Sequence, residues 1–117
     1  MFGVEKNNSV KYDKLIRDKI PEIIAAKGSE AIIEILDAES YRKCLDIKLV
    51  EEVKEYLEDG SAEELADIVE VVYALLEYKG VSREEFEKIR IAKVEERGAF
   101  KKRLFLKEVI NGIQVEA

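Results

Sequence analysis

The fold of this chain is governed by residues 38–79, AESYRKCLDIKLVEEVKEYLEDGSAEELADIVEVVYALLEYK. Apolar side chains recur at helical spacing on both sides of Asp59-Gly60, which predicts helices over about 38–58 and 61–79. Ser61 is expected to cap the second of these helices, with Glu64 in the capping-box position. Because the break between them is tight, the two helices are expected to be antiparallel neighbours.

Carboxylates interrupt the apolar faces of both predicted helices. With about 100° of rotation per residue, Glu52 falls within roughly 60° of Leu45 and Leu49, and Glu64 within roughly 40° of Ile68 and Val71. A carboxylate in such a place needs a compensating cation, because an isolated buried charge is very costly. Oxygen ligands suit Mg²⁺, Mn²⁺ or Ca²⁺. The candidate ligands on these two helices are Glu52, Glu55, Glu64 and Asp67.

Composition limits the classes of function. A chain of 117 residues that is 47% hydrophobic is expected to form one domain over 1–117, and its net charge of −6 argues against a nucleic-acid duplex as partner. The chain has no histidine and one cysteine, Cys44, which argues against a zinc site, a Ser-His-Asp triad and an intrachain disulfide. With no apolar run long enough to span a membrane and no signal peptide, a cytoplasmic protein is expected.

The remaining segments complete a mainly α fold, a small antiparallel helix bundle. Asp18 is expected to cap a short helix that carries Pro21 in its first turn, and Ser82 is expected to cap a helix that runs to about Arg97. Residues 31–36 and 102–108 have strand-like composition and are expected to pair as a short two-stranded sheet. Residues 1–11 are expected to be a loose N-terminal segment.

The helix predicted over 61–79 is apolar around most of its circumference. A helix of this kind is buried on several faces, and a single small bundle cannot cover it fully. A homodimer or higher homo-oligomer that packs through this region is therefore expected.

Two basic clusters accompany the acids. Lys93 and Arg97 lie one helical turn apart, and Arg103 follows Gly98 closely enough to join them. Lys14 and Arg17 lie near the other end of the chain. Taken singly, each of these residues is explained by ion pairs with surface acids. As a set beside a four-carboxylate site, they suit an anionic, metal-bound substrate such as a nucleoside triphosphate.

Three sequence blocks together resemble a known family. The acidic block reads Glu51-Glu52-Val-Lys-Glu55 followed by Glu64-Leu-Ala-Asp67, with KLIRDKIPE at 14–22 and KVEERGAFKKR at 93–103 on either side. The chain is similar over roughly 12–109 to the all-α nucleoside triphosphate pyrophosphohydrolases, the MazG-like and phosphoribosyl-ATP pyrophosphohydrolase-like group, and to its house-cleaning subgroup. The gap between the two acidic halves is shorter here than in many members, which leaves open whether Glu63 or Glu64 is the ligand.

The resemblance implies Mg²⁺-dependent hydrolysis of a nucleoside triphosphate, expected to be a non-standard one, to the monophosphate and pyrophosphate, with Mn²⁺ as a substitute ion. It implies that the four acids named above hold the metal and that Glu51, Glu52 and Glu55 take part in catalysis, Glu51 by orienting or activating water. The residues implied to contact the phosphates or the base are Lys93, Arg97, Arg103, Lys14 and Arg17.

Two other functions stay open at the level of sequence. Phosphoribosyl-ATP pyrophosphohydrolase of histidine biosynthesis has the same arrangement of acids, although the block at 14–22 favours the house-cleaning subgroup. Alternatively, the chain is a non-enzymatic, oligomeric helical interaction protein whose acids form structural ion pairs with its 20 lysines and arginines. The base, the sugar and the number of metal ions are not specified by the sequence.

Overall fold

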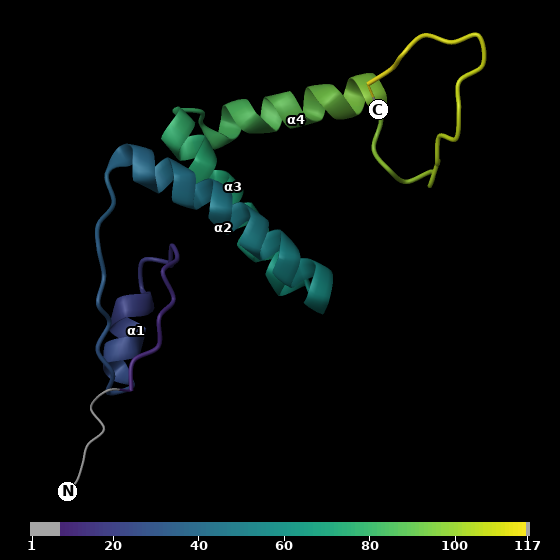
Figure 1. Cartoon of the computed structure of the whole chain (residues 1–117). Helices are drawn as coiled ribbons and strands as arrows, with labels where there is room; N and C mark the ends of the chain where they lie inside the picture. Colours follow the sequence, from purple (N-terminus) through teal and green to yellow (C-terminus); the bar gives the residue numbers. More distant parts are fainter. Residues whose placement is uncertain (1–7, 117) are drawn as a thin grey trace, which may run out of the picture. The chain divides into compact units, whose positions relative to one another are not determined.

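The computed structural model describes residues 8–116, and these are mainly helical, as predicted (Figure 1). The helices are α1 (Ile20–Ala26), α2 (Ala38–Asp59), α3 (Ala62–Lys79) and α4 (Arg83–Arg97). The chain divides after Ser82 into two compact units, the first with α1 to α3 and the second with α4 and the residues that follow it. Of the predicted loose segment 1–11, the first seven residues lie outside the described part.

Local capping explains where α2 and α3 begin and end. The Asp37 side chain accepts a hydrogen bond from the Ser40 N–H at 2.8 Å and starts α2. Gly60 ends α2 in the left-handed conformation, with φ of 72°, and its N–H donates to the carbonyl of Tyr56. Ser61 Oγ then accepts a hydrogen bond from the Glu64 N–H at 3.3 Å, so the predicted cap of α3 is confirmed.

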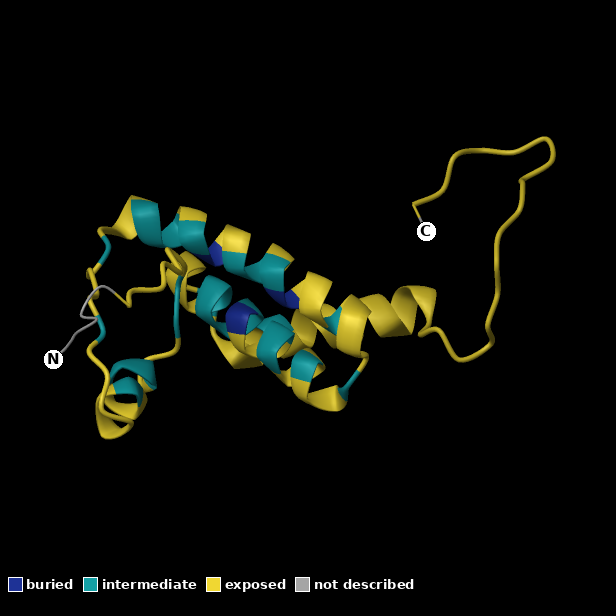
Figure 2. Cartoon of the chain, turned by 60° about the horizontal axis from the view of Figure 1, so that its bottom comes forward, coloured by how far each residue is buried: buried dark blue, intermediate teal, exposed yellow. Residues whose placement is uncertain are grey.

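Helices α2 and α3 form an antiparallel pair, as predicted (Figure 2). The rings of Tyr41, near the start of α2, and Tyr78, near the end of α3, meet edge to face with centroids 6.2 Å apart. Leu45 of α2 and Val71 of α3 are buried. Glu52 is buried as well, so a carboxylate lies among the apolar contacts that hold the pair together.

The second unit has no buried residue among those described. Helix α4 begins directly after Ser82, where a cap was predicted, and it ends at Arg97 before Gly98, whose φ is 86°. Residues 99–116 continue without helix or strand, and Phe100, Leu104 and Phe105 are almost fully exposed.

Two predictions of local structure are wrong. Residues 31–36 and 102–108 form no sheet, since residues 8–116 contain no strand. Ile32 and Ile35 are more than nine-tenths exposed, and a turn at Lys101-Lys102 with φ of 58° at Arg103 breaks the extended backbone of the second segment. A strand needs a hydrogen-bonded neighbour, which local composition alone does not provide.

The second error concerns the start of the short helix α1. Lys19, not Asp18, occupies the N-cap position, and no side chain caps the helix. Pro21 lies in the first turn, as predicted. Its fixed φ suits that position, and its missing N–H leaves one fewer donor for a cap to satisfy. No helix among residues 8–116 is both long enough and apolar enough to cross a membrane.

Candidate metal centre

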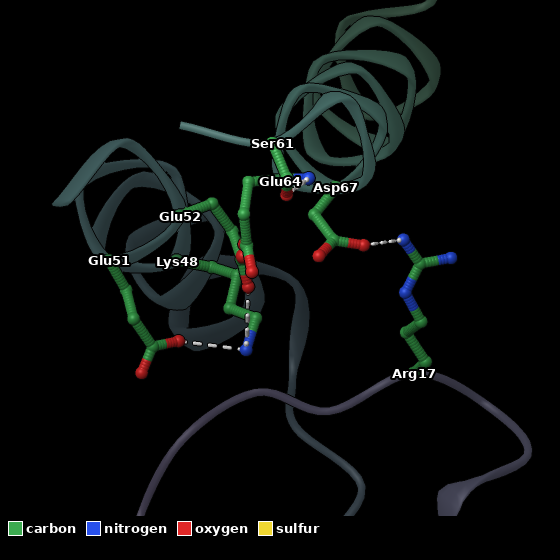
Figure 3. Close-up of polar contacts among 7 residues, drawn as sticks. All are labelled: Arg17, Lys48, Glu51, Glu52, Ser61, Glu64 and Asp67. Carbon is green, nitrogen blue, oxygen red and sulfur yellow. Dashed lines mark hydrogen bonds and ion pairs between the residues drawn. The ribbon is translucent and has the colours of Figure 1, made fainter. Parts of the chain in front are cut away.

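The antiparallel pairing brings acids of α2 and α3 together near the turn that connects the helices (Figure 3). One carboxylate oxygen from each of Glu52, Glu64 and Asp67 lies within 4.8 Å of the others. Glu52 and Glu64 extend toward each other from the two helices, and Asp67 follows one turn further along α3. Three of the four predicted ligands therefore converge.

Glu52 is the most informative member of this group. The residue is only 7% exposed, and its Oε2 has no hydrogen-bond partner among the described residues. Burial raises the pKa of the Glu52 carboxyl, and the nearby Glu55 carboxylate raises it further, while Lys48 opposes both. A buried carboxylate oxygen without a donor is costly. Such an oxygen suits a ligand atom for a cation.

Glu64 and the adjacent Glu63 differ in their surroundings. Its backbone N–H is held by the Ser61 cap, and its half-buried side chain belongs to the three-carboxylate group. Glu63, one residue earlier, is exposed and lies outside that group. Loss of hydration raises the pKa of the Glu64 carboxyl, and the carboxylates of Asp67, Asp59 and Glu52 raise it further. The three carboxylates of this group therefore carry negative charge that no positive charge within the group balances.

Glu55, the fourth predicted ligand, is exposed and lies outside the converging group. It lines an open depression of about 340 Å³ together with Glu58, Asp59 and Glu64. Because Glu64 belongs to both, this acidic depression adjoins the three-carboxylate group.

The segment before α1 places two basic side chains beside acids of α2 and α3. Arg17 Nη2 lies 2.6 Å from Asp67 Oδ1, and Lys14 Nζ lies 3.7 Å from Glu51 Oε2. The two residues are separated by about 50 and 37 positions from their partners, so only the tertiary structure creates these ion pairs. Both cations were predicted to belong to the site, and the structure places both beside its acids.

A third cation, Lys48, was not among the predicted site residues. Its Nζ lies 2.8 Å from Glu51 Oε1 and 3.4 Å from Glu52 Oε1, and its side chain is 15% exposed. Burial lowers the pKa of Lys48, but the two glutamates outweigh this, and the pKa lies above its ordinary value. The same hydrogen bond lowers the pKa of Glu51. A lysine three and four residues before two glutamates was the signal in the sequence.

The other three predicted phosphate ligands belong to the second unit. Arg97 pairs with Glu96 at 3.2 Å and with Glu116 at 3.0 Å. Lys93 and Arg103 are exposed and make no ion pair with another residue between 8 and 116. Within its own unit, this cluster thus has two cations whose charge is not neutralised by a neighbouring acid.

The donor set fits a hard divalent cation. All candidate ligand atoms are carboxylate oxygens, the ligands that Mg²⁺, Mn²⁺ and Ca²⁺ prefer. The described group contains no sulfur ligand, and the chain has no histidine. One of its oxygens is buried and has no partner among residues 8–116, which sets the group apart from ordinary surface acids.

Comparison with known proteins gives one partial match. An uncharacterized protein of Mycolicibacterium smegmatis (strain ATCC 700084 / mc(2)155) is 48% identical over 42 residues, which is 36% of this chain. The matched stretch covers 43% of that protein's length, so the likeness is confined to a part of each chain. No protein-family model matches the chain. No solved structure matches it either.

Proposed function

We propose that this protein is a Mg²⁺-dependent nucleoside triphosphate pyrophosphohydrolase that converts a non-standard nucleoside triphosphate to the monophosphate and pyrophosphate. The observation that carries the proposal is the convergence of Glu52, Glu64 and Asp67, one of which has a buried oxygen without a partner. The resemblance of the acidic, N-terminal and C-terminal blocks to the MazG-like group supports the same reaction.

The residues around the acids have chemistry suited to this reaction. A divalent cation held there would offset the charge of the phosphates and acidify the attacking water. Glu51 is held ionised by Lys48 and Lys14, so it can accept a hydrogen bond from that water, although its lowered pKa makes it a weak base. Glu55, exposed beside the depression, is the better placed acceptor for a proton.

Each unit carries cations suited to an anion such as a triphosphate. Arg17 lies beside Asp67 and can turn a guanidinium N–H to a phosphate oxygen. Lys93 and Arg103 have no acidic partner among the described residues and are free to bind an anion. Mn²⁺ is expected to substitute for Mg²⁺, since both bind carboxylate oxygens. We further propose that the protein acts in the cytoplasm.

The protein is also proposed to act as a homodimer or higher homo-oligomer. Among the large apolar residues of residues 8–116, only Leu45 and Val71 are buried. Leu65 and Val69 of α3 are 45% and 44% exposed, on the helix that was expected to pack against another copy. A second copy of the chain would remove these side chains from water.

The decisive experiment is pyrophosphate release from a panel of standard and modified nucleoside triphosphates and phosphoribosyl-ATP, with and without Mg²⁺. Mg²⁺-dependent release is expected for at least one modified triphosphate. Asp67→Asn and Glu55→Gln should abolish it, and Glu63→Gln, a change at an exposed acid outside the group, should not. Release confined to phosphoribosyl-ATP would assign the histidine-pathway reaction instead. A folded protein that releases no pyrophosphate from any substrate would contradict the proposed enzyme activity and would favour the interaction-protein function.

A further inference from the structure

Lys48 occupies an unusual place for a lysine. It lies on α2, its side chain is 85% shielded from solvent, and its ammonium contacts one oxygen of Glu51 and one of Glu52 (Figure 3). The helical spacing brings Lys48 within reach of both glutamates, although a lysine that precedes its glutamate by four residues is the less favourable order for such a pair. Lysine is also among the residues that are almost never buried without a specific partner.

The contact with Lys48 gives the two oxygens of the Glu52 carboxylate different surroundings. Oε1 lies 3.4 Å from the ammonium, whereas Oε2 is buried and has no hydrogen-bond partner among the described residues. An oxygen that already binds a cation is a poor ligand for a second one, so the unpartnered oxygen is the one left to bind a metal. The ammonium thereby restricts how the carboxylate can rotate about its last side-chain bond.

We propose that Lys48 is the positioning residue of the candidate metal centre: it holds the carboxylates of Glu51 and Glu52 on one side of α2 and leaves a single oxygen of Glu52 for the cation. This inference rests on the metal site of the proposed function. In this role, Lys48 contacts neither metal nor substrate and acts through Glu52. Groups that orient metal ligands in this way commonly change metal affinity about 10–100-fold when they are removed.

Substitution of Lys48 separates positioning from simple electrostatics. Removal of a positive charge beside a divalent cation would strengthen metal binding if Coulomb repulsion were the main effect. Loss of positioning has the opposite sign, because Glu52 would be free to adopt orientations that do not bind the ion. The direction of the change in affinity therefore distinguishes the two, and a purely structural role predicts no change in affinity for the folded protein.

The test is titration of the full chain with Mn²⁺, followed by calorimetry and by the electron paramagnetic resonance signal of the free ion. Lys48→Met is expected to bind Mn²⁺ about tenfold more weakly or worse, and Lys48→Arg, which retains the charge and the donors, is expected to restore most of the affinity. Lys43→Met is the matched control. Lys43 lies on the same helix, its side chain is 62% exposed, and its Nζ pairs with Glu39 at 3.9 Å.

Each outcome has a separate meaning. Binding by Lys48→Met that equals or exceeds that of the parent chain overturns the positioning role and leaves the metal site intact. Absence of Mn²⁺ binding by the parent chain overturns the metal site itself, and with it the proposed function. If Lys48→Met does not fold, Lys48→Ala, which also removes the donor, carries the test; an affinity equal to that of a Lys43→Ala control would then contradict the proposal.

Discussion

At the scale of single residues, the site is defined by carboxylates whose surroundings differ although their chemistry is the same. Glu51 receives a hydrogen bond from Lys48, Asp67 one from Arg17, and Glu55 faces solvent. Within residues 8–116, Glu52 is buried with an oxygen that no donor satisfies. These differences assign the acids different expected roles, which substitutions and pH can separate.

Glu52→Gln is expected to remove metal binding without loss of the fold. Replacement of the carboxylate by an amide of nearly equal size removes a buried negative charge that neighbouring acids repel. The melting temperature of the metal-free variant should equal that of the parent chain or exceed it by a few degrees, while Mn²⁺ affinity falls more than about tenfold. Thermal melts and Mn²⁺ titration check this. A large fall in the metal-free melting temperature would show that Glu52 stabilises the helix pair by itself.

The metal-free protein is expected to become more stable as the pH falls from neutral toward the ordinary glutamate pKa of 4.5. The pKa values of Glu52 and Glu64 are raised in the folded chain, so the folded state binds their protons more tightly than the unfolded state does. Their contribution is fully present below the ordinary glutamate pKa of 4.5 and is lost as the pH rises through the raised values. The pKa of Glu51 is lowered in the folded chain. Its contribution to the stability of the fold is therefore lost only at more acidic pH.

Thermal melts at a series of pH values, with and without Mg²⁺, measure this dependence. Mg²⁺ competes with protons for the same carboxylates, so saturating Mg²⁺ should remove the rise in melting temperature that accompanies the fall in pH. Glu52→Gln should reduce the rise, whereas Glu63→Gln, at an exposed acid, should preserve it. A melting temperature that falls steadily over this range would contradict the assignment.

At the scale of elements, the turn between α2 and α3 sets which acids face each other. Gly60 has φ of 72° and ends α2, and Ser61 begins α3 at once, so two residues fix the register of the antiparallel pair. Glu52 lies two turns before this connection, and Glu64 and Asp67 lie in the first two turns after it. A change in the turn is thus transmitted directly to the metal ligands.

Gly60→Ala tests this connection. No atom lies within 4 Å of the added methyl group, so the cost arises from the left-handed backbone and is about 1–2 kcal/mol. A fall of about 5 °C or more in the melting temperature is expected, measured by circular dichroism. Lys54→Ala, at an exposed position of α2, is the control and should change the melting temperature much less. Equal melting temperatures for Gly60→Ala and the parent chain would mean that the turn tolerates another conformation.

At the scale of the whole molecule, the described chain buries few of its apolar side chains. Two large apolar residues among 8–116 are buried. Large apolar residues on every helix, in the connection between α1 and α2 and in the segment after α4 are exposed. Surfaces of this kind on folded proteins usually contact another molecule. The expected partner is a second copy of the chain.

Val69→Glu is expected to separate the oligomer. Val69 lies on α3, is 44% exposed within one chain, and would be desolvated by a second copy. A buried, unpaired carboxylate is costly, so the mass measured by light scattering should fall toward that of one chain of 13.4 kDa. Lys79→Glu, at the exposed end of the same helix, should not change the mass. A parent chain that is monomeric at all concentrations would contradict the oligomer.

The amino-acid sequence by itself determined α2, α3 and α4, because their caps, glycine ends and apolar spacing act over a few residues and agree with one another. It also determined that acids share the inner faces of α2 and α3, because that follows from helical geometry. Strand-like composition at 31–36 and 102–108 did not determine a sheet, since strands need a partner that local composition cannot provide, and residues 8–116 contain no strand. Tertiary structure decided that Glu64 and not Glu63 joins Glu52, that Arg17 reaches Asp67, and that one oxygen of Glu52 is buried without a partner. These last features depend on side-chain direction and burial across two helices and a connecting segment, which no spacing within one element specifies.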